Sequence, residues 1–247
     1  MLTVGVDLAA EPERTAVAGI EWSDERARVC EVVCGADDDA VVAAIAQAQK
    51  AGIDCPLGWP DDFVAFVAAH RAGHVTVRGD LTGREWRRRL TLRLTDRVVH
   101  AETGLTPLSV AADRIGHVAL RCAGLLALLA GQGVPVDRCG TGTVVEVYPS
   151  ASLKSWGLPH RGYKRPAEIE PLSELVDRLL AAAPWLDLGR AESLCRRSHD
   201  AADAVVAALT ARAVSQNLAS VPAAGQEAAA RTEGWIAVPT APLDRLR

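Results

Sequence analysis

The sequence predicts an α/β fold built on a mixed sheet of five strands with helices on both faces. Three strand-like segments with short connections begin the chain, and strands and helices then alternate. The 247 residues can form one large core, and no Ser/Gly/Pro-rich or highly charged stretch in the interior resembles a linker. We therefore expect a single domain over residues 1–247.

The first three strands are expected to form an antiparallel meander. Residues 2–7, LTVGVD, are an apolar run that ends in an acid, and residues 15–22 and 27–33 are two further strand-like runs. The turns between these runs are short and polar, as antiparallel neighbours allow. The prediction places Asp7 at the end of the first strand.

A helix and a fourth strand follow the meander. Residues 37–50 are rich in Ala and Val at helical spacing, begin with an acidic turn and end before a glycine. Residues 52–55 are a short apolar run that carries Asp54 where the strand stops. A Pro/Gly segment then interrupts regular structure before a helix predicted over residues 61–72.

The middle of the chain supplies the fifth strand. Residues 84–97 are rich in arginine, a turn is expected at 103–107, and Ser109 could cap a helix that extends to about residue 131. Residues 143–147 are a compact β-branched run that carries Glu146. This run is the fifth strand that the sequence predicts.

The C-terminal part is predicted to be mainly helical. Two helices are expected over residues 171–182 and 199–214, with residues 185–190 as the connection between them. Residues 234–238 could add a short edge strand to the sheet.

Five acidic residues are expected to meet at one edge of this sheet. Asp7, Asp54 and Glu146 lie at or near the ends of predicted strands, where open α/β sheets bind ligands. Asp200 and Asp203 are three residues apart in a predicted helix, which places both carboxylates on one face. So many carboxylates in one crevice would repel each other unless cations lay among them, and oxygen donors suit Mg²⁺ or Mn²⁺. Two such ions can activate a water and stabilise the leaving oxygen of a phosphodiester.

Structural interpretations of these acids also stay open. Asp7 could cap the following turn, and Asp54 could be an Asx-turn residue before Cys-Pro. Glu146 could lie on the solvent face of an edge strand. Asp200 could have a purely structural role, because a carboxylate near a helix N-terminus interacts favourably with the helix dipole. Asp203, one turn further into its helix, has less structural reason to be acidic.

Six segments spread over nearly the whole chain resemble a known family. They are VGVDLA, GIDCPLGWP, RLTD, VVEVYPSA, HDAADAVVAAL and EGWIAVP. In this order they are similar to a family of unknown function whose members are described as predicted nucleases with a ribonuclease H-like fold. The resemblance implies that Asp7 corresponds to the first-strand acid of that superfamily and Asp54 to the acid that ends the fourth strand. Asp200 and Asp203 resemble the paired last-helix acids of Holliday-junction resolvases, whereas Glu146 has no such counterpart.

Basic and polar residues near these segments are candidate substrate contacts. The arginines of residues 84–97 could form a local phosphate-binding surface with Trp86 available for stacking, or could be solvated or paired with neighbouring acids. Arg93 lies in the RLTD segment. Tyr163 and Lys164, in a predicted loop, could hold a phosphate or a base, although such residues are also common in ordinary loops.

Composition restricts the partners. A net charge of −4 does not suit a protein that coats nucleic acid by electrostatics alone, so any such contact must be local. Six cysteines without a CxxC pair argue against a zinc site and a disulfide framework. The start of the sequence is a poor secretory signal, and the longest apolar stretch, residues 122–130, is too short to span a membrane. We expect a cytoplasmic protein without membrane contact.

Three functions are compatible with this pattern. The first is a Mg²⁺- or Mn²⁺-dependent nuclease or phosphodiesterase that uses the carboxylates as metal ligands. The second is a phosphotransferase of the actin-like branch, but the residues after Asp7, LAAEPERT, lack the glycines of a phosphate loop. The third is a non-catalytic binding module that retains the fold. The sequence leaves open whether the substrate is DNA, RNA or a smaller phosphoester, and which oligomeric state the chain adopts.

Overall fold

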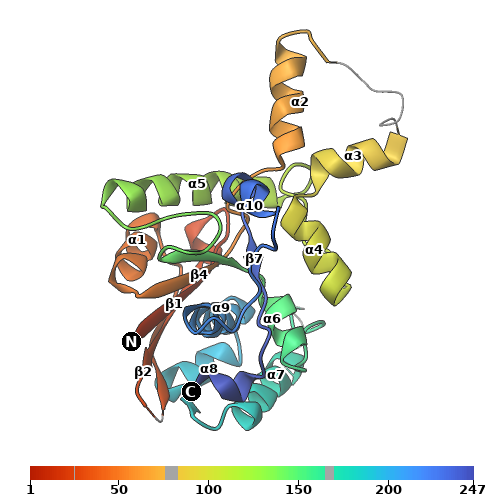
Figure 1. Cartoon of the computed structure of the whole chain (residues 1–247). Helices are drawn as coiled ribbons and strands as arrows, with labels where there is room; N and C mark the ends of the chain where they lie inside the picture. The colour runs from red at the N-terminus through yellow and green to blue at the C-terminus, as the bar shows by residue number, and fades with distance from the viewer. Residues whose placement is uncertain (25, 76–82, 165–169) are drawn as a thin grey trace.

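The computed structural model describes residues 1–24, 26–75, 83–164 and 170–247, and its centre is a seven-stranded mixed sheet (Figure 1). The strand order is β6-β3-β2-β1-β4-β5-β7. The strands are β1 (Leu2–Asp7), β2 (Ala16–Trp22), β3 (Ala27–Cys34), β4 (Lys50–Asp54), β5 (Val144–Val147), β6 (Leu186–Asp187) and β7 (Ile236–Ala237). Strands β1, β2 and β3 pair antiparallel, as expected, and β4, β5 and β7 extend the sheet in parallel from β1.

Helices occupy much of the rest of the described chain. They are α1 (Asp38–Gln47), α2 (Asp61–Arg71), α3 (Gly83–Thr91), α4 (Leu94–Thr103), α5 (Ile115–Gly131), α6 (Pro149–Ser155), α7 (Glu170–Ala182), α8 (Glu192–Cys195), α9 (His199–Ser215) and α10 (Glu227–Glu233). The expected α/β class with a mixed sheet is therefore confirmed. Among the described residues, no helix is both long and apolar enough to cross a membrane.

The predicted number of strands is wrong, because two short strands extend the sheet at its edges. Strand β6 lies within the segment expected as a connection and pairs in parallel with β3, where Ala27 faces Leu186. Strand β7 lies within residues 234–238 and pairs with β5. Strand β7 thus falls in the segment that the sequence offered as an edge strand, whereas β6 has only two residues, too few for an alternating pattern to reveal it.

Two expected helix boundaries also differ. The helix predicted over residues 37–50 ends at Gln47, and Lys50 instead begins β4. The buried Lys50 ammonium donates to the carbonyls of Gly140 and Gly142, at 2.5 and 2.6 Å, and these bonds replace the water that it loses. The helix expected from Ser109 starts only at Ile115, because the Ser109 hydroxyl caps a separate turn by accepting from the amide of Ala112.

Helix α9 packs directly on one face of the central strands. A side chain at Gly5 would overlap the backbone of α9 at Ala204 and Ala208, and a Cβ at Gly52 would lie 2.6 Å from the Ala207 carbonyl. Glycine on the strands and alanine on the helix therefore permit a separation that larger residues would prevent.

Helices α1 and α5 cover the opposite face of the same strands. Val6 and Ile53 point to this side and belong to one buried cluster with Ile45 of α1 and Leu125 of α5. Because side chains alternate along a strand, the residues on either side of Val6 and Ile53 point toward α9 instead. This alternation decides which acids reach α9.

Helices α2 and α3, which we call the arm, project from the rest of the molecule (Figure 1). All residues of α2 are described, and none of them is buried. The rings of Phe66 on α2 and Trp86 on α3 pack in a T-shaped arrangement with 5.4 Å between their centroids. The arginine-rich segment is thus divided between α3, which is exposed, and α4, which packs against the rest of the protein.

Candidate metal-binding site

Asp7 and Asp54 lie side by side where β1 and β4 end. The two strands are parallel, and Asp7 aligns with Asp54 just as Gly5 aligns with Gly52. Each strand therefore has the pattern Gly-x-Asp, with the glycine under α9 and the acid two residues later on the same face. The local sequence that lets the helix approach also directs both carboxylates to it.

The start of α9 brings two more acids to this point. The Ser198 hydroxyl caps the helix by accepting from the amide of Ala201, and Asp200 and Asp203 follow within the first turn and a half. One carboxylate oxygen each from Asp7, Asp54 and Asp203 lie within 4.8 Å of one another.

A second group of possible ligands overlaps the first. Donor atoms of Asp7, His199 and Asp200 also lie within 4.8 Å of one another, so Asp7 belongs to both groups. The structure thus brings together the four aspartates that the sequence singled out as candidate metal ligands and catalytic residues.

The acids differ in their electrostatic environment. Burial, followed by the nearby Asp203 and Asp54, raises the pKa of Asp7 well above its usual value. Burial also raises the pKa of Asp54 to about 7, although Lys164 opposes this shift. Burial would raise the pKa of Asp200 as well, but hydrogen bonds from His199 and Arg14 outweigh it and lower this pKa to about 2. More negative than positive groups therefore act on Asp7 and Asp54, whereas Asp200 is hydrogen-bonded to Arg14.

Tyr163 and Lys164 both contact the buried Asp203. The Tyr163 hydroxyl donates to Asp203 Oδ1 at 2.8 Å, and Lys164 Nζ lies 2.5 Å from Oδ2. Asp203 is fully buried, and the Lys164 side chain remains 45% exposed. The two residues expected as substrate contacts thus lie at the acidic cluster, where they hold one of its carboxylates. Their role toward a substrate stays a prediction.

Glu146 points away from the four aspartates. It aligns with Ile53 and not with Asp54, so its side chain leaves the sheet on the opposite face. Both of its carboxylate oxygens accept from the Arg93 guanidinium, at 2.7 and 2.8 Å. Burial raises the pKa of Glu146, and Arg93 opposes that shift. Among the described residues, Glu146 joins neither group of possible metal ligands.

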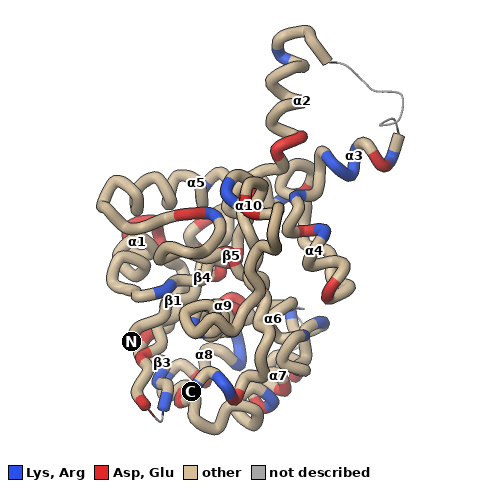
Figure 2. The backbone as a smooth tube through the Cα atoms, viewed as in Figure 1, with Lys and Arg blue, Asp and Glu red and all other residues tan. Residues whose placement is uncertain are grey.

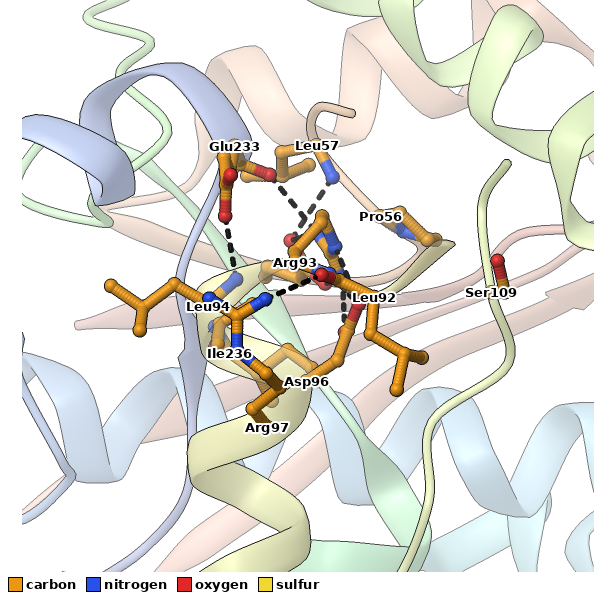
Figure 3. Close-up of polar contacts among 12 residues, drawn as sticks. Pro56, Leu57, Leu92, Arg93, Leu94, Asp96, Arg97, Ser109, Glu233 and Ile236 are labelled. Carbon is orange, nitrogen blue, oxygen red and sulfur yellow. Dashed lines mark hydrogen bonds and ion pairs between the residues drawn. The ribbon is translucent and has the colours of Figure 1, made fainter. Parts of the chain in front are cut away.

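Arg93 has a different environment from the one expected of a phosphate contact. It is 1% exposed and also binds both carboxylate oxygens of Asp96 and the carbonyl of Glu233 (Figure 3). The expected pairing of arginines with nearby acids therefore holds at this position. The resulting buried cluster joins α4, β5 and the end of α10.

Two residues at these sites were not identified from the sequence. Arg14 reaches Asp200 with its Nε 3.3 Å from Oδ2, and nothing in its local sequence indicates this contact. Glu233 accepts from the backbone amides of Asp61 and Leu94, at 2.9 and 2.6 Å, where α2 and α4 begin. Its position at the start of the EGWIAVP segment was the available signal.

A cleft of about 550 Å³ opens over the aspartates. Asp7, Asp54, Asp200 and Lys164 line it together with apolar residues such as Leu108 and Ile115. The volume lies within the range of roughly 300–1,000 Å³ that is common for small-molecule and cofactor sites.

A family model described as "Protein of unknown function (DUF429)" matches residues 5–227. The chain belongs to this family. The DUF429 match includes all four aspartates and most of the sheet, but it ends before Glu233 and β7. Searches of curated proteins and of solved structures each gave no significant match.

Proposed function

We propose that this DUF429 protein is a divalent-metal-dependent phosphodiester hydrolase, and in particular a nuclease. The observation that carries the proposal is the pair of overlapping ligand groups that share Asp7, a residue that lines the cleft. Two ions held by a shared carboxylate are the arrangement used for in-line displacement at phosphorus.

The donor atoms fit Mg²⁺ or Mn²⁺. They are carboxylate oxygens with one imidazole, and hard oxygen donors are what these ions prefer. Burial, followed by the neighbouring carboxylates, raises the pKa of Asp7, so its ionised form is disfavoured without a cation and would be stabilised by a bound metal ion. When bound, the metal would polarise the phosphoryl oxygen and lower the pKa of a coordinated water.

The residues of the chain divide the remaining tasks. Asp7 belongs to both ligand groups, so it would hold metal together with Asp54 and Asp203 in the first group and with Asp200 and His199 in the second. Tyr163 orients Asp203 through its hydrogen bond. Lys164 supplies a positive charge at the cleft, where a phosphate would bind beside the cluster.

We further propose that the fold is of the ribonuclease H-like type. Support comes from the acids that end β1 and β4 and from the paired acids of α9, since these are the positions that the resemblance assigns to the superfamily. The five strands expected from the sequence form the contiguous centre of the sheet.

Metal-dependent cleavage with matched variants tests the function. We expect the protein to bind Mn²⁺ in calorimetry and to hydrolyse bis(p-nitrophenyl) phosphate and DNA or RNA oligonucleotides only with metal. Asp7→Asn should abolish hydrolysis and weaken Mn²⁺ binding, because it removes the ligand common to both groups. Asp244→Asn, at an exposed position near the C-terminus, is the matched control and should behave as wild type.

Three outcomes would contradict this assignment. Hydrolysis that survives Asp7→Asn would exclude the proposed site. Tight ATP binding without cleavage would indicate a phosphotransferase of the actin-like branch. Absence of both Mn²⁺ binding and cleavage would indicate a non-catalytic binding module.

A further inference from the structure

One face of α3 on the arm carries three exposed arginines. Arg84, Arg87 and Arg88 are spaced three and four residues apart, so their side chains share one side of the helix. All three are exposed, and Figure 2 shows the basic residues of α3 on the projecting arm. The chain as a whole has a net charge of −4, so this face is a local concentration of positive charge.

The apolar side of α3 fixes the direction of this basic face. Trp86 and Leu90 lie on the side of the helix opposite Arg84, and both are partly buried. Trp86 packs against Phe66 of α2. Trp86 is therefore used inside the arm, and the arginines point away from α2 into solvent.

Both ends of the arm begin at the rim of the acidic cleft. Pro56, two residues after Asp54, lines the cleft just before α2, and Arg93 lines it just after α3. The buried ion pair of Arg93 with Glu146 and the bonds of Glu233 to the starts of α2 and α4 attach both ends firmly. The arm is therefore attached to the rest of the protein beside the cleft at both of its ends.

Distance decides which ligand can use both features. Arg84 lies seven residues before Thr91, where α3 ends, and a helix advances about 1.5 Å per residue, so Arg84 lies roughly 10 Å along the helix from the end that leads to Arg93 and the cleft. A single phosphate or a small diester cannot reach both ends of this span. An extended polyanion with regularly spaced phosphates can, and guanidinium groups match phosphate oxygens in shape and charge.

We propose that the Arg84, Arg87 and Arg88 face of α3 binds the phosphate backbone of a nucleic-acid strand whose scissile bond lies at the aspartates. This inference rests on the proposed function and adds to it a substrate of several nucleotides. The arm acts in binding alone, and the acids act in cleavage.

Binding measured without metal tests the arm separately from cleavage. Fluorescence anisotropy with labelled 20-nucleotide single strands and duplexes is measured in EDTA on the Asp7→Asn background. The triple variant R84Q/R87Q/R88Q should bind at least about tenfold more weakly at moderate salt, and the slope of log K against log salt should fall by about 2 to 3. The triple variant R84K/R87K/R88K should recover most of the affinity, which separates charge from any loss of folding.

A control variant with the same loss of charge is available. R26Q/R190Q/R245Q removes three exposed arginines that lie outside the cleft and the arm, and its affinity should stay within about twofold of the parent protein. Arm variants that bind as tightly as the parent protein would overturn the proposal. A dimer of the parent protein that the arm variant converts to monomers, with nucleic-acid affinity unchanged, would overturn it in favour of self-association.

Failure of the proposed function has a separate signature. Hydrolysis of bis(p-nitrophenyl) phosphate by the wild-type protein reports on the acids alone, because this diester is too small to reach α3. No hydrolysis with normal, arm-dependent nucleic-acid binding would reject the nuclease and keep the binding surface. Hydrolysis with arm-independent binding would reject the binding surface and keep the nuclease.

Discussion

Replacing Gly52 by alanine should both destabilise the protein and disturb the acidic cluster. A Cβ at this position would lie 2.6 Å from the Ala207 carbonyl oxygen and 3.0 Å from Val147 Cγ1, whereas ordinary contact begins at 3.4 Å. The backbone of α9 must therefore retreat by about 0.8 Å. Because the nearest atom is backbone, no side-chain rotation can relieve the overlap, and we expect a loss of about 1–3 kcal/mol in the free energy of unfolding.

Urea denaturation measures this loss, and Gly19→Ala is its control. At Gly19 the closest atom to an added Cβ is the Sγ of Cys30 at 3.0 Å, which can rotate away. Alanine in a strand loses less conformational entropy than glycine, so Gly19→Ala should be neutral or slightly stabilising. The retreat of α9 should also separate Asp54 from Asp203 and weaken Mn²⁺ binding. Equal unfolding free energies for the two alanine variants would refute the close contact of α9 with the sheet.

Two further predictions concern buried charge. Arg93→Met should lower the free energy of unfolding by about 3–5 kcal/mol in urea denaturation, because it leaves buried carboxylates without a partner. Arg97→Met, at an exposed position, should change it by less than about 0.5 kcal/mol. A similar small loss for both variants would show that the buried cluster does not stabilise the fold. Because the pKa of Asp54 is raised to about 7 in the folded protein, its contribution to stability is present at low pH and is lost as pH rises from about 4 through about 7. Metal-free wild type should therefore become less stable over this range in thermal melts, Asp54→Asn should flatten that decline, and a decline that is unchanged by the substitution would contradict the assignment.

The buried cluster around Arg93 shows where local pattern is insufficient. From the sequence, an arginine in a basic segment and a glutamate at a strand end were reasonable contacts for phosphate and metal. In the structure they form an ion pair with each other, because the Glu146 side chain leaves its strand on the face opposite to that of Asp54, although all three residues line the same cleft. The difference of one residue in register between Glu146 and Asp54 decides this outcome, and register depends on the partner strand.

What the sequence by itself determined was the local periodicity and chemistry of each segment. The apolar runs predicted the first five strands and placed Asp7 and Asp54 at the ends of two of them. The spacing of Asp200 and Asp203 placed both on one side of a helix. These features depend on neighbours within a few residues, so one chain is enough to read them.

Tertiary structure alone decided which of these groups meet. Strand β6 pairs with β3 within a segment that the sequence predicted as a connection, because two residues cannot specify a strand by themselves. Tyr163 and Lys164 contact Asp203 although Tyr163 lies 40 residues before it in the sequence, so no local pattern indicates these contacts. The approach of α9 to the sheet depends on Gly5 and Gly52 lying side by side, a consequence of strand register that no single segment contains.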